Sequence, residues 1–149
     1  MQTATMLSRN KEILPETKYQ RIGGKPAIRR LVSRFYELMD EMPEAYTARK
    51  IHPRDLSQSG EKFVMFLSGW LGGPQLYVEK FGHPMLRRRH LPYPIGPQER
   101  DEWLMCMRIA MDETIADAEL RGQIYQAMVP LAEHMLNRGE DGGACGCGH

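Results

Sequence analysis

Two prolines confine a single histidine to a segment that has room for only one short helix. In residues 82–94, Pro84 and Pro92 stand on either side of His90. Proline suits the first position of a helix, where its missing N–H costs no hydrogen bond. The residue before a proline is disfavoured in the helical region. We therefore predict a helix that begins at Pro84, leaves His83 outside, and has His90 in its last turn.

The predicted place of His90 suits a metal ligand. At the C-terminal end of a helix, the negative end of the helix dipole makes a ring nitrogen more basic. Leu86 lies one turn earlier on the same face, and residues 87–89 are three successive arginines. A basic nitrogen beside an apolar side chain and positive charges fits a flat apolar cofactor with anionic edges. Haem has those properties.

Composition limits the classes of protein to consider. The 149 residues are the length of one ordinary domain. The 20 Lys and Arg residues nearly balance the 19 Asp and Glu residues, so the surface offers no general attraction for nucleic acid or an anionic membrane. No apolar run approaches the length of a membrane span, and residues 1–17 lack the apolar core of a signal peptide. We expect a cytoplasmic protein without nucleic-acid or membrane partners.

The spacing of apolar residues predicts an all-α fold. Steps of three and four residues indicate amphipathic helices, whereas no alternating pattern indicates a strand. Ser57 or Ser59 is expected to cap one helix, Pro97 to open another, and Pro130 to bend the last. Besides the short helix that ends near His90, the expected helical segments are residues 26–42, a short piece within 43–51, 57–70, 76–81, 97–115 and 118–137.

The C-terminal tail, residues 139–149, is mostly glycine, charge and cysteine. It is too poor in apolar surface to offset its ordering entropy, so we expect it to be flexible. Cys145, Cys147 and His149 could hold a soft metal ion, but incidental thiols in a flexible tail are the simpler interpretation. The three cysteines of the chain do not form the framework of a secreted disulfide domain, and a reducing compartment fits them.

Several sequence blocks, in this order along the chain, resemble those of group II truncated haemoglobins. They begin at Tyr19, Arg34, Phe66, Gly82 and Glu99, and they read YQRIGG, RFY, FLSGWLGGP, GHPMLRRRH and ERDEWL. The resemblance implies a truncated globin, a two-over-two helical sandwich around non-covalently held haem b. It also implies a globin domain at residues 19–138, between an N-terminal extension at 1–18 and the tail.

The resemblance makes His90 the one protein ligand of the haem iron. Leu86 and Phe63 are expected to contact the haem on its two sides. Positive side chains near these residues are expected to pair with the haem propionates. These candidates are Lys62 and Arg89, with Arg87 in reserve.

On the opposite side of the haem, the family's ligand-stabilising donors correspond to Trp103 and Tyr36. An indole N–H can only donate a hydrogen bond, so Trp103 is a directional donor that also contacts the haem. The third polar position corresponds to His52, where many relatives carry tyrosine or phenylalanine. Ser59 stands where larger globins usually carry a distal histidine, and its small side chain would leave the entrance open.

The resemblance implies a haem protein that binds dioxygen, nitric oxide or carbon monoxide. Nitric oxide oxidation or peroxide reduction could accompany this binding as a side activity. Repeated turnover in these reactions would need an external reductase, because we expect no reductase domain in this chain. Both a monomer and a homodimer stay open. The alternative is a non-haem, all-α metal or thiol module that uses His90, His52 and the tail cysteines, and only haem would give a Soret band.

Overall fold

The computed structural model describes residues 16–86, 90 and 93–137, and the regular structure in these residues is helical. This confirms the predicted all-α class. The helices are α2 (Lys18–Ile22), α3 (Gly24–Glu41), the 3₁₀-helix η1 (Pro43–Ala45), α4 (Tyr46–Lys50), α5 (Ser57–Trp70), α6 (Leu76–Phe81), α8 (Pro97–Thr114) and α9 (Ala118–His134).

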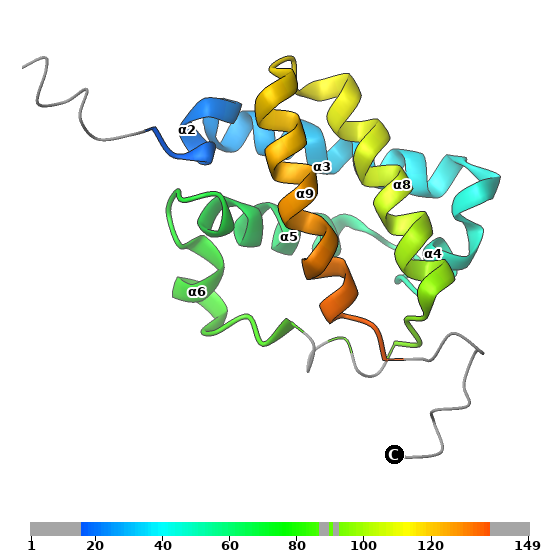
Figure 1. The fold of residues 1–149 in the computed structure, drawn as a ribbon. Helices are drawn as coiled ribbons and strands as arrows, with labels where there is room; N and C mark the ends of the chain where they lie inside the picture. Colours follow the sequence, from blue (N-terminus) through cyan, green and yellow to red (C-terminus); the bar gives the residue numbers. More distant parts are fainter. Residues whose placement is uncertain (1–15, 87–89, 91–92, 138–149) are drawn as a thin grey trace, which may run out of the picture.

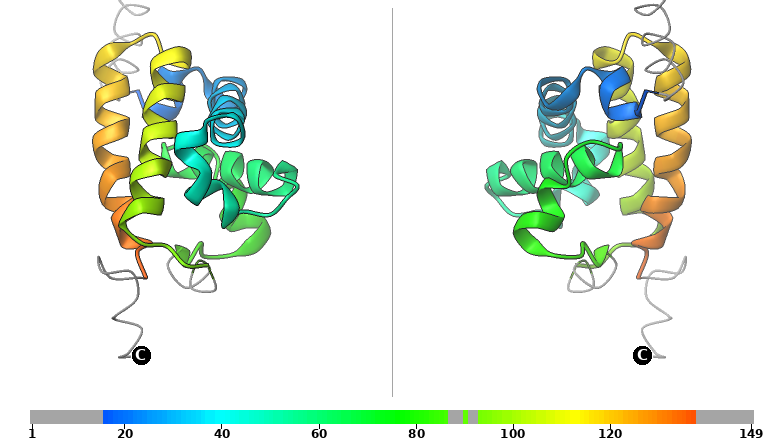
Figure 2. Two further views of the ribbon diagram at one scale, coloured as in Figure 1. Left: turned by 90° about the vertical axis from the view of Figure 1, so that its right-hand side faces the viewer. Right: turned by 90° about the vertical axis from the view of Figure 1, so that its left-hand side faces the viewer.

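The long helices form two layers. Helix α3 packs against α5 and α8, and α8 packs against α9. The views in Figure 2 show α8 and α9 running alongside each other, with α3 and α5 forming the other layer. Helix α6 lies on the side of α5 that faces away from α3 (Figure 1). This arrangement is the predicted two-over-two sandwich.

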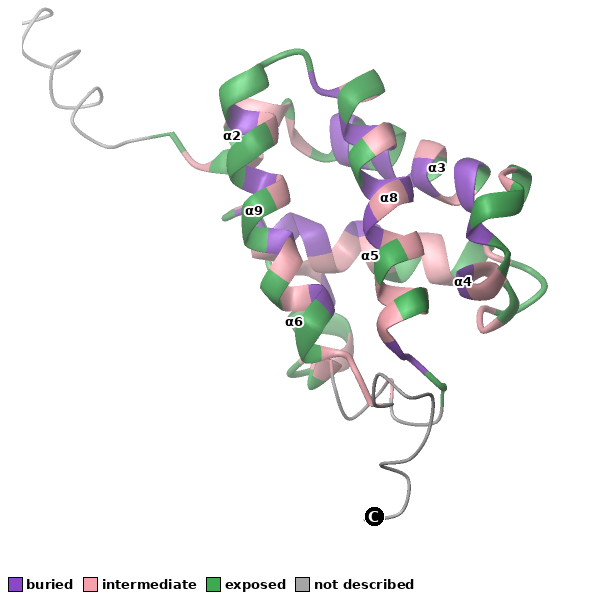
Figure 3. Ribbon diagram, turned by 45° about the vertical axis from the view of Figure 1, so that its right-hand side comes forward, coloured by how far each residue is buried: buried purple, intermediate pink, exposed green. Residues whose placement is uncertain are grey.

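The core lies where the apolar faces of the four long helices meet. Its fully buried side chains follow helical spacing along each helix, and burial of such a side chain contributes about 1.5–3 kcal/mol. Figure 3 shows these buried segments along the inner faces of α3, α8 and α9. They include Ile28, Leu31 and Phe35 on α3, Leu67 on α5, Cys106, Met107 and Met111 on α8, and Leu120, Ile124 and Met128 on α9.

The turn between α2 and α3 fixes how the first long helix begins. Helix α2 starts with a capping box, in which Thr17 Oγ1 accepts from the Gln20 N–H at 3.1 Å and Gln20 Oε1 accepts from the Thr17 N–H at 3.0 Å. Gly23 ends α2 with φ of 112°, in the left-handed region that favours glycine. The chain therefore leaves α2 and enters α3 within one residue.

The start of α5 differs from the prediction. Leu56 is the residue before the helix, and neither Ser57 nor Ser59 caps it. Instead, Asp55 Oδ1 accepts from the Ser57 N–H at 2.9 Å and from the Ser57 hydroxyl at 2.6 Å. The predicted serine cap is wrong because Ser57 is itself the first helical residue and its hydroxyl and N–H both bind Asp55.

The end of the last helix also differs from the prediction. Helix α9 ends at His134, whereas periodicity predicted a helix that continues to residue 137. Pro130 lies inside the helix, as expected. The Asn137 N–H donates to the carbonyl of Ile95 at 2.9 Å, so a partner distant in sequence takes the place of a helical hydrogen bond.

A close contact between Tyr19 and Gly73 gives a test of the fold. A Cβ at Gly73 would lie 2.3 Å from a ring carbon of Tyr19, whose N–H donates to the Leu71 carbonyl at 2.8 Å. We expect Gly73→Ala to lower the free energy of unfolding by about 1–3 kcal/mol because the ring must move. Urea denaturation measures this change.

The matched control is Gly122→Ala in α9, where an added Cβ meets nothing within 4 Å. Alanine is the better helix former, so this variant should gain up to about 1 kcal/mol. Equal stabilities for the two variants would contradict the proposed steric role of Gly73.

Candidate functional site

The ring of His90 is held in a defined tautomer by a backbone carbonyl. His90 is half-buried, and its Nδ1 lies 2.7 Å from the carbonyl oxygen of Leu86. A carbonyl can only accept, so Nδ1 carries the proton and the Nε2 lone pair of the neutral ring is left for another partner. Metal-binding histidines are commonly oriented in this way.

The turn before His90 differs from the prediction. Leu86 is helical and Pro84 is not. Between them, Met85 has φ of 48°, a conformation that is uncommon for a residue with a side chain. The prediction that Pro84 opens this helix is therefore wrong, because Met85 breaks the helical path between Pro84 and Leu86. His83 is outside the helix, as expected.

Of the predicted propionate partners, Lys62 lies among the described residues. Lys62 is exposed on α5, and its Nζ lies 5.5 Å from the ring centre of Phe81 on α6. This contact directs the lysine toward α6 and leaves its charge accessible to an anion. Arg87 and Arg89 lie outside the described residues.

The predicted distal side chains come together in one aromatic cluster. Phe35 is fully buried, with ring centroids 4.9 Å from Tyr36, 5.7 Å from Phe63 and 5.1 Å from Trp103. The rings of Phe63 and Trp103 lie 5.9 Å apart, and His52 lies 6.0 Å from Tyr36. The cluster joins α3, α5, α8 and the turn after α4. The sequence indicated Phe35 only as a core residue.

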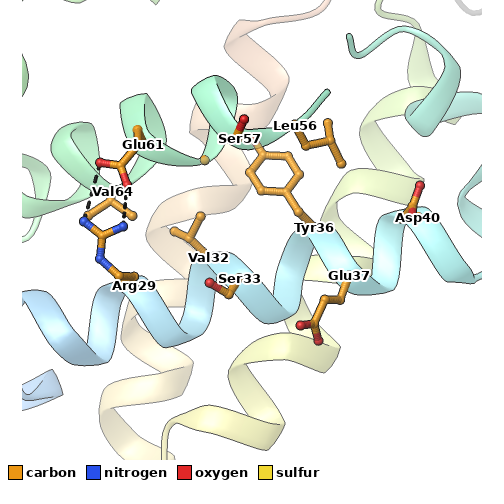
Figure 4. Close-up of a pocket in the computed structure, with 11 residues that line it drawn as sticks. Arg29, Val32, Ser33, Tyr36, Glu37, Asp40, Leu56, Ser57, Glu61 and Val64 are labelled. Atoms are coloured by element: carbon orange, nitrogen blue, oxygen red, sulfur yellow. Dashed lines mark hydrogen bonds and ion pairs between the residues drawn. The ribbon is translucent and has the colours of Figure 1, made fainter. Parts of the chain in front are cut away.

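Tyr36 also lines a groove between α3 and α5. The groove has a volume of about 420 Å³ and includes Gly60 and Ser57 among its lining residues. Figure 4 shows Tyr36 rising from α3 toward the start of α5, and the ion pair of Arg29 with Glu61 spanning the two helices. Tyr36 thus belongs both to the aromatic cluster and to this surface groove.

Ser59 is half-buried on α5, one turn before Phe63. It is absent from the residues that line the groove between α3 and α5. The open entrance that we expect beside Ser59 stays a prediction.

His52 is oriented in the same way as His90. Its Nδ1 donates to the carbonyl of Ala48 at 2.8 Å. Burial lowers the pKa of His52, the hydrogen bond to Ala48 opposes this shift, and the charges of Arg49 and His90 lower the pKa further. The neutral ring therefore presents Nε2 as an acceptor, and protonation would turn Nε2 into a donor.

Glu102 connects His52 to α8, a role that sequence reasoning missed. Its Oε1 accepts from the N–H of Ala48 at 2.7 Å, the residue whose carbonyl orients His52. Its Oε2 accepts from Gln98 at 3.0 Å, and Gln98 also donates to the Thr47 hydroxyl at 3.2 Å. In the sequence, Glu102 is recognisable only as a favourable charge near the start of a helix. No local pattern signals its partner in α4.

Tyr36 and Trp103 supply donors from two different helices. Burial raises the pKa of Tyr36, so its hydroxyl stays protonated and can donate. The indole of Trp103 can only donate, and Trp103 is half-buried at the edge of the core. The two side chains therefore suit a ligand that accepts hydrogen bonds.

The residues present fit a haem. His90 offers one imidazole nitrogen, the aromatic cluster offers an apolar wall with donors, and Lys62 offers an accessible positive charge. In the described part of the chain, no group of three or more His, Cys, Asp or Glu residues could hold a metal ion. Cys145, Cys147 and His149, on which the non-haem alternative depends, lie outside the described residues.

Comparison with known proteins identifies the family. The model of the bacterial-like globin family matches residues 17–137. The chain belongs to this family. It is therefore a haem protein that binds diatomic ligands such as oxygen, and the non-haem alternative is not favoured.

Individual relatives agree with this assignment. The chain is 41% identical to group 2 truncated hemoglobin YjbI of Bacillus subtilis over 117 residues, which cover 78% of this chain and 86% of that protein. The group II 2-on-2 hemoglobin of Agrobacterium tumefaciens has a TM-score of 0.81 and 59% identity, covering 83% of this chain and 95% of the other. The truncated oxygen-avid haemoglobin of Bacillus subtilis has a TM-score of 0.75 and 40% identity, covering 82% and 100%.

These relatives confirm the resemblance to group II truncated haemoglobins. Within the described residues, no helix combines the length and the apolar character needed to cross a membrane.

The orientation of His52 predicts a pH dependence. We expect His52 to face the bound ligand, where protonation turns its Nε2 into a donor, so oxygen release should slow as the pH falls through the pKa of His52. Because burial lowers that pKa from its ordinary value of 6.5, the midpoint should lie below pH 6.5. Stopped-flow oxygen dissociation across a pH series measures the profile.

Replacing His52 with tyrosine should flatten the profile, whereas His134→Tyr at an exposed position on α9 should leave it intact. A profile that survives His52→Tyr unchanged would reduce His52 to a packing residue.

Proposed function

We propose that this globin holds haem b through His90 alone and binds dioxygen on the side of Tyr36, His52 and Trp103. The observation that carries the proposal is the 2.7 Å hydrogen bond from His90 Nδ1 to Leu86, which leaves Nε2 as the ligating atom. When bound, haem supplies an iron with an open coordination position for a diatomic ligand. The other properties of the site come from the protein.

Each distal side chain offers the ligand a different hydrogen-bonding group. Trp103 donates from α8 in a fixed direction, and Tyr36 adds a hydroxyl from α3. His52 contributes an acceptor when neutral and a donor when protonated. Hydrogen bonds to a charged acceptor are stronger than neutral ones, so these donors would favour a diatomic ligand that carries partial negative charge when bound, such as dioxygen. The oxygen-avid character given to the relative from Bacillus subtilis supports this proposal.

Other side chains hold the haem itself. We propose that Leu86 and Phe63 contact its two sides and that Lys62 and Arg89 pair with its propionates, with Arg87 as a further candidate. Lys62 is exposed and its Nζ contacts the Phe81 ring, which supports a place at the edge of the site. Such a pair at the surface fixes the haem orientation more than it adds stability.

We also propose nitric oxide oxidation or peroxide reduction as a side activity in the cytoplasm. Oxidation of nitric oxide to nitrate would consume the bound dioxygen and one electron from the haem iron, so repeated turnover would need an external reductase. Rapid mixing of the oxygenated ferrous protein with nitric oxide tests competence, because stoichiometric formation of ferric protein is expected. Catalytic cycling in a cell extract would identify the electron donor.

Replacing His90 with glycine tests the iron ligand. We expect His90→Gly to lose haem during gel filtration, since the single protein bond to iron is gone. Added imidazole should restore haem binding and the Soret band. The control is His83→Gly, an exposed histidine, which should keep its haem. A five-coordinate histidine spectrum in His90→Gly without imidazole would rule out the assignment.

Replacing Trp103 with phenylalanine tests the main donor. A hydrogen bond to a charged group is worth about 1.5–3 kcal/mol, so oxygen release should become about tenfold faster or more. Tyr36→Phe should have a smaller effect. The matched control is Trp70→Phe, whose ring stacks on Phe66 at 6.5 Å and should not affect release. An unchanged oxygen dissociation rate in Trp103→Phe would refute the donor role.

A further inference from the structure

The residue just beyond the last helix binds the segment that follows His90. The side-chain amide of Asn137 donates through Nδ2 to the carbonyl of His90 at 3.2 Å and to the carbonyl of Tyr93 at 2.8 Å. Its Oδ1 accepts from the N–H of Ile95 at 2.9 Å. Its backbone N–H donates to the Ile95 carbonyl, also at 2.9 Å. One asparagine thus binds three residues of this segment.

This contact connects parts of the chain that are distant in sequence. Asn137 lies three residues past the end of α9 at His134, and Ile95 lies two residues before the start of α8 at Pro97. The asparagine therefore holds the His90 backbone against the layer formed by α8 and α9. Nothing in the spacing of apolar residues indicates this contact, because it consists of polar bonds outside any helix.

The carbonyl of His90 needs such a partner. The last carbonyls of a helix have no intrahelical donor and must be satisfied from elsewhere. The Tyr93 N–H supplies one donor at 2.9 Å, and Asn137 supplies the second. Because Asn137 also binds the carbonyl of Tyr93, it connects the backbone of His90 to that of Tyr93.

We propose that Asn137 is the positioning residue of the proximal histidine. The Leu86 carbonyl orients the imidazole ring of His90, and Asn137 holds the backbone of His90. Together these two hydrogen bonds determine the direction in which Nε2 points. Asn137 does not contact the haem in this proposal and acts only through His90. The inference rests on the proposed role of His90 as iron ligand.

Two substitutions of Asn137 separate its donor groups from its size and its acceptor. Asn137→Asp keeps the size and the acceptor for the Ile95 N–H, but it removes both donors and places a carboxylate against two carbonyl oxygens. Asn137→Ala removes the side-chain bonds to His90, Tyr93 and Ile95 and keeps the backbone bond to Ile95. Both variants should therefore free the His90 backbone, the aspartate more strongly.

The matched control lies at the other end of α9. Arg121 Nη1 donates to the Ile115 carbonyl at 2.7 Å, which is also a part-buried bond from a side chain to the backbone. Arg121→Gln should lower the melting temperature and leave the position of His90 unchanged. It separates a general loss of stability from an effect on the iron ligand.

The experiment compares the haem-loaded ferrous proteins by resonance Raman spectroscopy of the iron–histidine stretching band and by haem transfer to apomyoglobin. We expect a shifted or broadened band in Asn137→Asp and Asn137→Ala, with haem loss faster by about tenfold, the factor that corresponds to one lost hydrogen bond of about 1.4 kcal/mol. Arg121→Gln should keep the parental band and the parental haem-loss rate.

The possible results separate the two proposals. An unchanged band and haem-loss rate in both Asn137 variants would overturn the inference, even if both melt at lower temperature. If Asn137→Asp folds but retains no haem, a shifted band in Asn137→Ala still supports the inference and an unchanged band overturns it. Retention of haem by His90→Gly would instead refute the proposed iron ligand, whatever the Asn137 variants show.

Discussion

Phe35 occupies the point at which α3, α5 and α8 meet, and the proposed distal side of the haem site depends on its complete burial. Its ring lies within 6 Å of the rings of Tyr36, Phe63 and Trp103, so one apolar side chain sets the spacing of the two donors and the aromatic wall. Protein interiors are densely packed, and a change of volume here would move all three neighbours. The polar chemistry of the site is therefore positioned by an apolar contact.

His90 and His52 are oriented by the same kind of local hydrogen bond. In each, Nδ1 donates to the carbonyl four residues earlier, at Leu86 for His90 and at Ala48 for His52. Each ring then presents Nε2 as its free nitrogen. What differs is the support of the backbone: Asn137 binds the segment after His90, and Glu102 binds the Ala48 N–H before His52. Local bonds set the tautomer, and long-range bonds set the position.

Local signals in the sequence predicted the helices, whereas long-range polar bonds could not be predicted from it. The periodicity of α3 and the proline that opens α8 are local signals, and they predicted these helices correctly. The two-over-two sandwich was implied by the family resemblance, and the structure confirms it. The family resemblance indicated Tyr36, His52 and Trp103, which the structure brings into one cluster around Phe35.

The failures occur where the structure is determined by something other than apolar spacing, either a hydrogen bond from a polar side chain or an unusual backbone angle. Asp55 takes the place of a serine cap, and Asn137 leaves the helical path to bind Ile95. Met85, with φ of 48°, separates Pro84 from the helix that Pro84 was expected to open. The contact of Glu102 with Ala48 joins two helices and has no signature in either. Apolar periodicity carries no information about such bonds.

The position of Asn137 near the end of the domain has a consequence for synthesis of the protein. A chain leaves the ribosome from its N-terminus, and the local bond between His90 and Leu86 can form as soon as that turn emerges. The bonds from Asn137 to His90, Tyr93 and Ile95 must wait until nearly the whole domain has been translated. In a nascent chain, the imidazole of His90 can thus have its final tautomer long before Asn137 binds the backbone of this histidine. The bonds from Asn137 form only after α9 has emerged from the ribosome.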